Sequence, residues 1–197
     1  MSKYKDRIVD SYGDTSIMSF GANKHMSTFA TYGAIVTDND ELAYRIERVR
    51  LNGKTGRDKT VEFVGMNAQS HEDKAVQCWL ALKYFDEWQK RRFEIAAYYD
   101  KEFADRFVPL RRHTKEWNAH KYAIMFEDKF EAQAQLAKLG IESEPHYPNI
   151  LPQSGNYPGA ERFVKQSLSI PINAHMTDAE AEQVVDTVEQ VWKNNIT

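Results

Sequence analysis

A lysine that could act as a nucleophile follows the first strand-like stretch of the chain. Residues 12–20 indicate a turn leading into a short strand, and Lys24 comes next in Ser19-Phe-Gly-Ala-Asn-Lys24-His-Met. An amine reacts with a carbonyl at neutral pH when it is partly desolvated or close to other cations, and a loop over a cofactor provides such a setting. Taken alone, the pattern also fits a solvated loop lysine.

The remaining residue types favour no second kind of chemistry. His71, His113, His120 and His175 show no metal-ligand spacing with cysteines or carboxylates, so we predict no metal site. The sequence has no glycine-rich phosphate loop and no nucleophile elbow. The single cysteine, Cys78, has apolar neighbours at helical spacing, which predicts a buried, unreactive thiol.

Composition places the chain among ordinary globular proteins. Its 197 residues are 42% hydrophobic and 28% charged, and the formal net charge is −3 with both signs interleaved. Without a basic cluster, we expect neither nucleic acid nor an anionic membrane as the main partner. No stretch reaches the ~20 apolar residues that cross a bilayer, and the first residues lack the apolar core of a signal peptide. We therefore expect a cytoplasmic protein.

Two strands and two helices are predicted in the first half of the chain. After the strand that precedes Ser19, residues 33–37 predict another strand. Asp38 and Glu41 predict the start of a helix that ends at Asn52-Gly53. Residues 72–103 show a strong helical period with an aromatic stripe, for which we expect core packing; the stripe comprises Trp79, Leu82, Phe85 and Trp88.

The second half alternates strands and helices. Strand-like segments at 120–126, 141–144 and 167–170 surround a helix at 130–139 that begins near Asp128 and ends at Gly140. A capping box, Thr177-Asp-Ala-Glu180, opens the last helix, whose core face is marked by Val184, Val188 and Val191. The pattern predicts the tail of one α/β layer, a long helix and a small α/β domain.

Several motifs in a fixed order resemble the DegT/DnrJ/EryC family of sugar aminotransferases. Ser-Phe-x-x-x-Lys24 is followed by the strand Gly-Ala-Ile-Val-Thr-Asp and then by Gly65-x-Asn67. Further along come Arg91-Arg92 with Ile95-Ala96, Leu139-Gly140-Ile141 with His146-Tyr147, and Leu168-Ser-Ile-Pro171. Each pattern is loose by itself, whereas their order and spacing are specific.

The resemblance implies the C-terminal part of a type I pyridoxal-phosphate aminotransferase fold. Residues 1–70 would then end the large cofactor-binding domain, residues 71–108 would form the connecting helical region, and residues 109–197 would form the small α/β domain. The cofactor implied is pyridoxal 5'-phosphate.

The same resemblance implies roles for five residues. Lys24 would form the internal aldimine and later move the proton, and Ser19 would bind the cofactor phosphate. Asn67 would reach the phosphate site of the neighbouring subunit, while His146 and Tyr147 would line the sugar site. The alternatives are a strand-end hydroxyl for Ser19, a turn residue for Asn67, and a turn histidine without a role for His146.

The resemblance also implies that the front half of the family's active site lies outside these residues. The family's phosphate-binding Gly/Thr turn, its ring-stacking aromatic residue and the aspartate paired with the pyridine nitrogen are not identified in the sequence. We therefore expect a homodimer, or a heteromer with a chain that supplies the N-terminal half.

The function expected from the resemblance is transamination of a nucleotide-linked keto sugar, with glutamate as amino donor. Two alternatives remain open, a non-catalytic assembly or binding subunit and a pyridoxal-phosphate-dependent sugar dehydratase. Some relatives that dehydrate carry histidine at the lysine position. Here, counting from Ser19, Lys24 holds that position and His25 follows it, which favours transamination.

Overall fold

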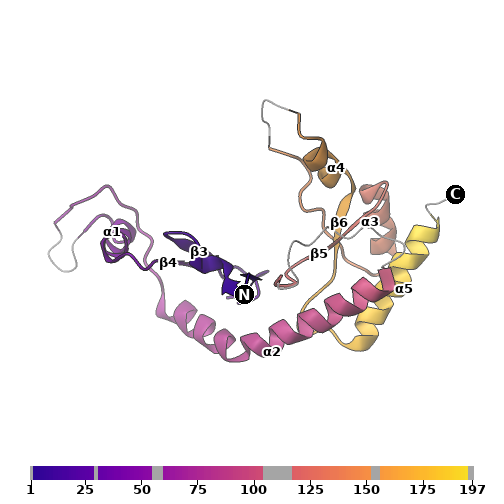
Figure 1. Cartoon of the computed structure of the whole chain (residues 1–197), viewed down its shortest axis with the longest axis horizontal. Coiled ribbons are helices and arrows are strands. Elements are labelled where there is room, and N and C mark those ends of the chain that lie inside the picture. The colour runs from indigo at the N-terminus through magenta and orange to yellow at the C-terminus, as the bar shows by residue number, and fades with distance from the viewer. Residues whose placement is uncertain (1, 29–30, 55–59, 104–116, 152–155, 195–197) are drawn as a thin grey trace. The chain divides into compact units, whose positions relative to one another are not determined.

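The computed structural model describes residues 2–28, 31–54, 60–103, 117–151 and 156–194. The chain divides into two compact units, residues 1–86 and 87–197, and the boundary falls inside one long helix. Figure 1 labels the elements.

Unit 1 is built on short antiparallel hairpins. Its elements are β1 (Lys3–Tyr4), β2 (Arg7–Ile8), the 3-10 turn η1 (Val9–Ser11), β3 (Ser16–Ser19), β4 (Gly33–Val36), α1 (Asp40–Arg50) and the first half of α2 (Glu72–Phe103). Strands β3 and β4 pair antiparallel, with Ser16 opposite Val36 and Ser19 opposite Gly33. The predicted strands are confirmed, while the β1–β2 hairpin was not expected.

Helix α1 begins one residue later than its sequence pattern suggests. The N-cap is Asn39, whose side-chain oxygen accepts a hydrogen bond from Leu42 N at 2.9 Å, so the prediction that Asp38 opens the helix is wrong by one residue. Aspartate and asparagine are both good N-cap residues. Which of them caps the helix depends on which side chain reaches the free N–H groups of the first turn. Asn52 and Gly53 follow the helix with positive φ angles, as expected for a helix stop.

Unit 2 has a two-stranded sheet packed with helices. Its elements are the second half of α2, β5 (Tyr122–Met125), α3 (Lys129–Lys138), α4 (Pro158–Gln166), β6 (Ser167–Ile170) and α5 (Asp178–Asn194). Strands β5 and β6 are antiparallel, with Tyr122 opposite Ile170 (Figure 1). The core draws on α2, both strands, α3 and α5, and its fully buried side chains include Tyr99, Phe103, Ile124, Leu136, Leu168 and Val188.

The local end signals of unit 2 are confirmed. Asp128 caps α3 by accepting from Phe130 N and Glu131 N at 3.0 Å each. The capping box of α5 is present, since Glu180 accepts from Thr177 N at 2.7 Å. Helix α4 was not predicted, because its N-cap, Tyr157, makes no capping hydrogen bond that a sequence pattern could reveal.

The aromatic stripe on α2 only partly packs into a core, which corrects the sequence-based expectation. In unit 1 the helix buries Cys78 and Ala81, but Trp79 is 57% exposed and Leu82 54% exposed. A three- and four-residue period shows that a helix has an apolar face, but it does not show what covers that face. The predicted burial of Cys78 is confirmed, and burial raises the pKa of its thiol.

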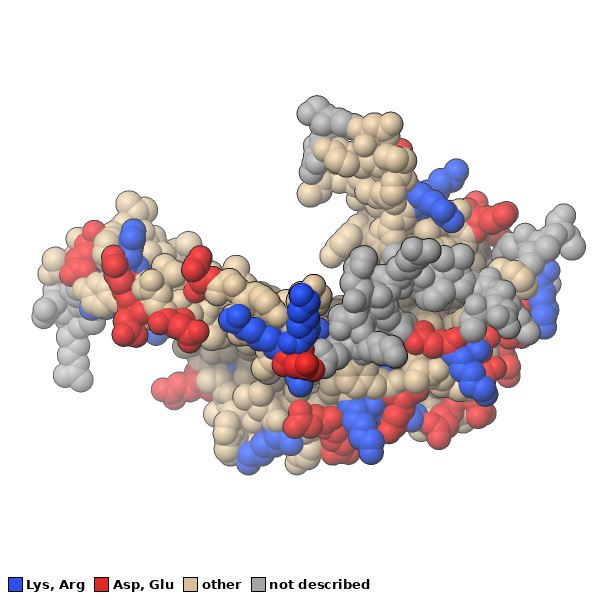
Figure 2. Space-filling view, viewed as in Figure 1, with Lys and Arg blue, Asp and Glu red and all other residues tan. Residues whose placement is uncertain are grey.

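Charges of both signs are mixed on the face that Figure 2 shows, with Lys and Arg interspersed among Asp and Glu. No helix within the described ranges is long and apolar enough to cross a membrane. Those same ranges contain no group of three His, Cys, Asp or Glu side chains that could hold a metal ion; His113 lies outside them.

Candidate active site

Lys24 lies on a loop that is closed at its base by three hydrogen bonds. Phe20 O accepts from Thr28 N at 2.8 Å and from Thr28 Oγ1 at 2.9 Å, and Phe20 N donates to Tyr32 O at 2.8 Å. Phe20 and Thr28 are buried, whereas the Lys24 side chain is exposed. The loop is thus anchored by its ends, and its amine remains available to a ligand.

The turn around Lys24 is also fixed within the loop. Lys24 N donates to Gly21 O at 2.9 Å, and the ring of the next residue, His25, lies 6.4 Å from that of Phe85 on α2. Lys24 itself forms no side-chain hydrogen bond or ion pair with the described part of the chain. The backbone is therefore held while the amine is left without an internal partner.

Ser19 is the last residue of β3, at a point where the backbones of β3 and β4 approach closely. Its strand partner is Gly33, and a Cβ atom on Gly33 would lie 2.9 Å from Met18 O. Along β3 the side chains alternate, so Ser19 shares the exposed face of the strand with Ile17, which is 81% exposed. The Ser19 hydroxyl has no partner in the described segments, and its position is open for an acceptor such as phosphate.

Asn67 is positioned by a close crossing of two glycines. A Cβ atom on Gly65 would lie 2.1 Å from Gly53 N, and Gly53 has a φ of +74°. Neither position has room for a side chain, so the backbone at Gly65 can lie against the residues that follow α1. This approach pairs Asn67 with Leu51 in an isolated β-bridge. The Asn67 side chain is exposed and accepts or donates no hydrogen bond within the described residues.

His146 belongs to unit 2 and is held through both ring nitrogens. Its Nε2 lies 3.1 Å from Glu144 Oε2, and its Nδ1 lies 3.1 Å from Ser169 Oγ. An ionised carboxylate only accepts hydrogen bonds, so Nε2 carries the proton and Glu144 fixes the tautomer. Lys121 Nζ, 3.6 Å from the same Glu144 oxygen, completes the charged surroundings.

Tyr147 is 69% exposed, and its ring meets that of His146 edge-on at 5.8 Å between centroids. His146 and Tyr147, which the sequence assigns together to the sugar site, are therefore suited to different roles. His146 is fixed by the protein, whereas the Tyr147 ring and hydroxyl are open to a ligand. The contact of His146 with Ser169, which lies 23 residues further along the chain, was not predicted from the sequence.

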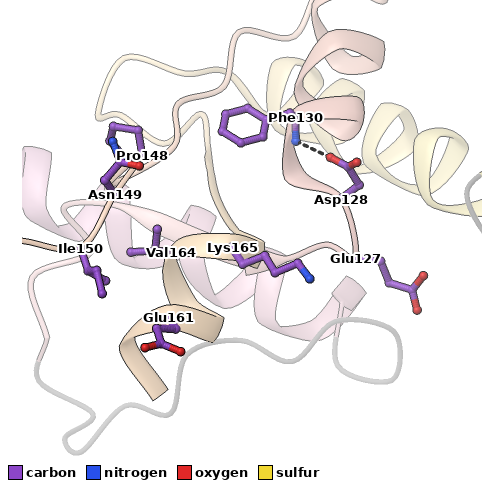
Figure 3. Close-up of a pocket in the computed structure, with 9 residues that line it drawn as sticks. All are labelled: Glu127, Asp128, Phe130, Pro148, Asn149, Ile150, Glu161, Val164 and Lys165. Carbon is purple, nitrogen blue, oxygen red and sulfur yellow. Dashed lines mark hydrogen bonds between the residues drawn. The ribbon is translucent and has the colours of Figure 1, made fainter. Parts of the chain in front are cut away.

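A pocket of about 550 Å³ is lined by Pro148, Asn149 and Ile150 together with residues near the start of α3 and in α4 (Figure 3). Phe130, Pro148, Ile150 and Val164 supply apolar walls, and Glu161 and Lys165 of α4 bring charges of both signs. Its size is in the range of small-molecule sites. Sequence reasoning missed it because its walls come from three segments that are separated along the chain, α3, residues 148–150 and α4.

Comparison with known proteins places these features in a family context. The model of the DegT/DnrJ/EryC1/StrS aminotransferase family matches residues 1–189. The chain is 28% identical over 99% of its length to dTDP-3-amino-3,4,6-trideoxy-alpha-D-glucose transaminase of Streptomyces venezuelae, of which it covers 54%. It is 30% identical over 95% of its length to dTDP-3-amino-3,6-dideoxy-alpha-D-galactopyranose transaminase of Aneurinibacillus thermoaerophilus, again covering 54%.

Solved structures agree with the fold. S. venezuelae DesV, in complex with a ketimine intermediate, matches with a TM-score of 0.88 at 28% identity over 98% of this chain and 55% of that one. The PLP form of the putative sugar aminotransferase Spr1654 from Streptococcus pneumoniae has a TM-score of 0.89 at 24% identity, over 100% of this chain and 56% of that one. The predicted α/β fold class is confirmed, and the chain spans about half the length of the curated relatives it matches.

Proposed function

Because the chain belongs to the DegT/DnrJ/EryC1/StrS aminotransferase family, we propose that it forms part of a pyridoxal-phosphate-dependent transaminase for a nucleotide-linked keto sugar. Glutamate is the proposed amino donor. The observation that carries the proposal is Lys24, an exposed amine on a loop anchored at its base, five residues after Ser19. Neither side chain has a hydrogen-bond partner among the described residues.

The free donors of unit 1 fit the cofactor's requirements for attachment and phosphate binding. Lys24 offers the primary amine that binds the cofactor carbonyl covalently, and Ser19 offers a hydroxyl for the phosphate. Asn67, held outward by the Gly53–Gly65 crossing, is proposed to reach the phosphate site of a neighbouring subunit. Bound pyridoxal phosphate supplies the electron sink for amino transfer.

Lys24 has a second role in this proposal. With the cofactor bound, the Lys24 amine would hold and move a proton as acid and base. The hydrogen bonds at the base of the loop restrict where this amine can go, which lowers the cost of orienting it for proton transfer. Residues of unit 2 are proposed to bind the sugar, with Tyr147 as the exposed contact and His146 as its fixed neighbour.

The exposed apolar side chains of unit 1 support the proposal that a partner polypeptide completes the site. Large apolar side chains of unit 1 remain open to solvent, among them Ile17 at 81%, Trp79 at 57% and Val64 at 98% exposed. Large apolar side chains that are this exposed are often covered by a partner at an interface. We propose that a second polypeptide, either another copy or a chain that supplies the remaining half of the fold, covers this surface and contributes the partner of the pyridine nitrogen.

A covalent trapping experiment tests the role of Lys24. The full chain, alone and mixed with a candidate N-terminal half, is incubated with pyridoxal phosphate, reduced with borohydride, digested and mapped by mass spectrometry. We expect a pyridoxyl group on Lys24, no label at that peptide in Lys24→Met, and normal labelling in the control Lys5→Met, which removes another exposed lysine of unit 1. Absence of a Lys24 label under both conditions refutes the enzyme proposal and favours the assembly or binding subunit.

Product analysis separates transamination from dehydration. A separate sample, loaded with pyridoxal phosphate but not reduced, is given dTDP-3-amino-3,4,6-trideoxy-alpha-D-glucose, the amino sugar in the name of the S. venezuelae relative, together with 2-oxoglutarate. Transamination run in this direction yields glutamate and a keto sugar. A product that has lost a hydroxyl group, without nitrogen transfer to 2-oxoglutarate, contradicts the transaminase proposal and supports a dehydratase.

A further inference from the structure

Lys129 is a buried lysine whose amine joins three segments of unit 2. It is the first residue of α3 and is only 1% exposed. Its Nζ donates to Tyr147 O at 3.2 Å and to Val164 O. The same amine lies 5.0 Å from the ring centroid of the next residue, Phe130.

The acceptors explain how an ammonium group is tolerated there. Val164 lies in the last turn of α4, where backbone carbonyls lack partners within the helix and carry the negative end of the helix dipole. The Tyr147 carbonyl lies in a turn outside any helix or strand, so it also needs a donor. A buried charge is costly unless it is hydrogen-bonded, and these two carbonyls meet that need.

The segments that Lys129 joins are also the walls of the pocket in Figure 3. Phe130 follows it on α3 and is 58% exposed, residues 148–150 follow Tyr147, and Val164 belongs to the α4 wall. Both carbonyls that bind the amine thus lie in or directly beside a wall. One amine therefore contacts the backbone of the α4 wall and the backbone directly before residues 148–150.

We propose that Lys129 is a positioning residue for the substrate, holding the His146–Tyr147 turn and α4 in the arrangement that receives the sugar. This inference rests on the proposed function. The purely structural alternative is a lysine that stabilises unit 2 without affecting substrate binding. The two differ in their consequences, because a positioning role moves KM while a stabilising role does not.

The test compares Lys129→Met, which keeps the aliphatic stem but removes the charge, with Lys129→Arg, which keeps the charge. Lys138→Met is the matched control, since Lys138 is an exposed lysine of the same helix. Hydrogen exchange of the full chain is followed by mass spectrometry. In Lys129→Met we expect exchange to rise about tenfold in segments 144–151 and 158–166 and to stay unchanged in α5.

Kinetics with the amino sugar used above provide the second measurement. In the active assembly, Lys129→Met should raise KM for the sugar about tenfold, with kcat and the Lys24 label unchanged, and Lys129→Arg should recover most of the loss. Unchanged exchange in 144–151, or faster exchange with an unchanged KM, overturns the inference. If Lys129→Met does not fold, Lys129→Arg decides through its residual effect. A KM that rises together with exchange in 144–151 is expected, whereas faster exchange in 144–151 with an unchanged KM overturns the inference.

Failure of the two proposals can be told apart. If the unaltered chain acquires no label at Lys24 and gives no turnover, the proposed function fails, and the substrate role of Lys129 fails with it. Suppose that the unaltered chain is labelled at Lys24 and turns over, and that the Lys129 variants show the same KM and hydrogen exchange as Lys138→Met. The inference about Lys129 then fails, while the proposed function stands.

Discussion

Replacing Tyr99 by phenylalanine should destabilise unit 2 by the value of one hydrogen bond. Tyr99 is fully buried, and its hydroxyl donates to Pro171 O at 2.9 Å, joining α2 to the residue after β6. Phenylalanine keeps the ring and its edge-to-face contact with Tyr122, at 5.1 Å between centroids, so no cavity forms. Because Pro171 is only half-buried, water can partly replace the donor, and we expect a loss of about 1 kcal/mol.

Urea unfolding followed by circular dichroism measures this loss. The matched control is Tyr98→Phe, at a half-buried neighbour whose hydroxyl makes no hydrogen bond within the described residues, and it should change the unfolding free energy by less than about 0.5 kcal/mol. A Tyr99→Phe value equal to the control would show that the hydroxyl contributes nothing. A loss above about 3 kcal/mol is typical of removing a whole buried aromatic ring, so it would show that the packing of the core had been disturbed.

The same substitution should alter the alkaline limb of stability. Burial raises the pKa of Tyr99 above its ordinary value of 10.0, so the folded state keeps its proton more tightly than the unfolded state. The resulting stabilisation is complete below pH 10 and is lost as the pH rises above it. Tyr99→Phe lacks this group, so the variant should lose less stability than the unaltered chain between about pH 10 and 11. If the stability of Tyr99→Phe and of the unaltered chain fell in parallel with rising pH, the raised pKa of Tyr99 would be refuted.

Two further substitutions test other parts of the chain. Gly65→Ala should destabilise unit 1 by ~1–3 kcal/mol or more in thermal unfolding, because the added Cβ would lie 2.1 Å from Gly53 N. The control Gly159→Ala, whose Cβ would have no atom within 4 Å, should be neutral or stabilising. In the capping box, the hydrogen bonds from Thr177 hold the pKa of Glu180 below its ordinary 4.5, so this stabilisation is present above pH 4.5 and is lost as the pH falls below it. Glu180→Gln should therefore flatten the acid limb of the stability curve, and an unchanged acid limb would count against the capping role.

Elements set by neighbouring residues could be predicted from the sequence. The bounds of α2, the strand β6 and the capping box of α5 were all predicted as the structure has them. Their signals are periodicity and side chains that bind the backbone within three residues, both of which are written in a short stretch of chain. The first residue of α1 and the whole of α4 were missed, since the deciding side-chain contact was ambiguous in one case and absent in the other.

The sequence by itself determined where Lys24, Ser19 and Asn67 fall relative to the strands and turns, because those spacings are local. Only the tertiary structure decided that Trp79 remains exposed while Cys78 is buried, since both lie on one apolar helix and the neighbouring elements choose which side is covered. It likewise decided that the Lys129 amine meets Tyr147 and Val164, 18 and 35 residues away. A lysine at the start of a helix is normally solvated. Only the arrival of two carbonyls from distant segments makes this one a buried anchor of the pocket.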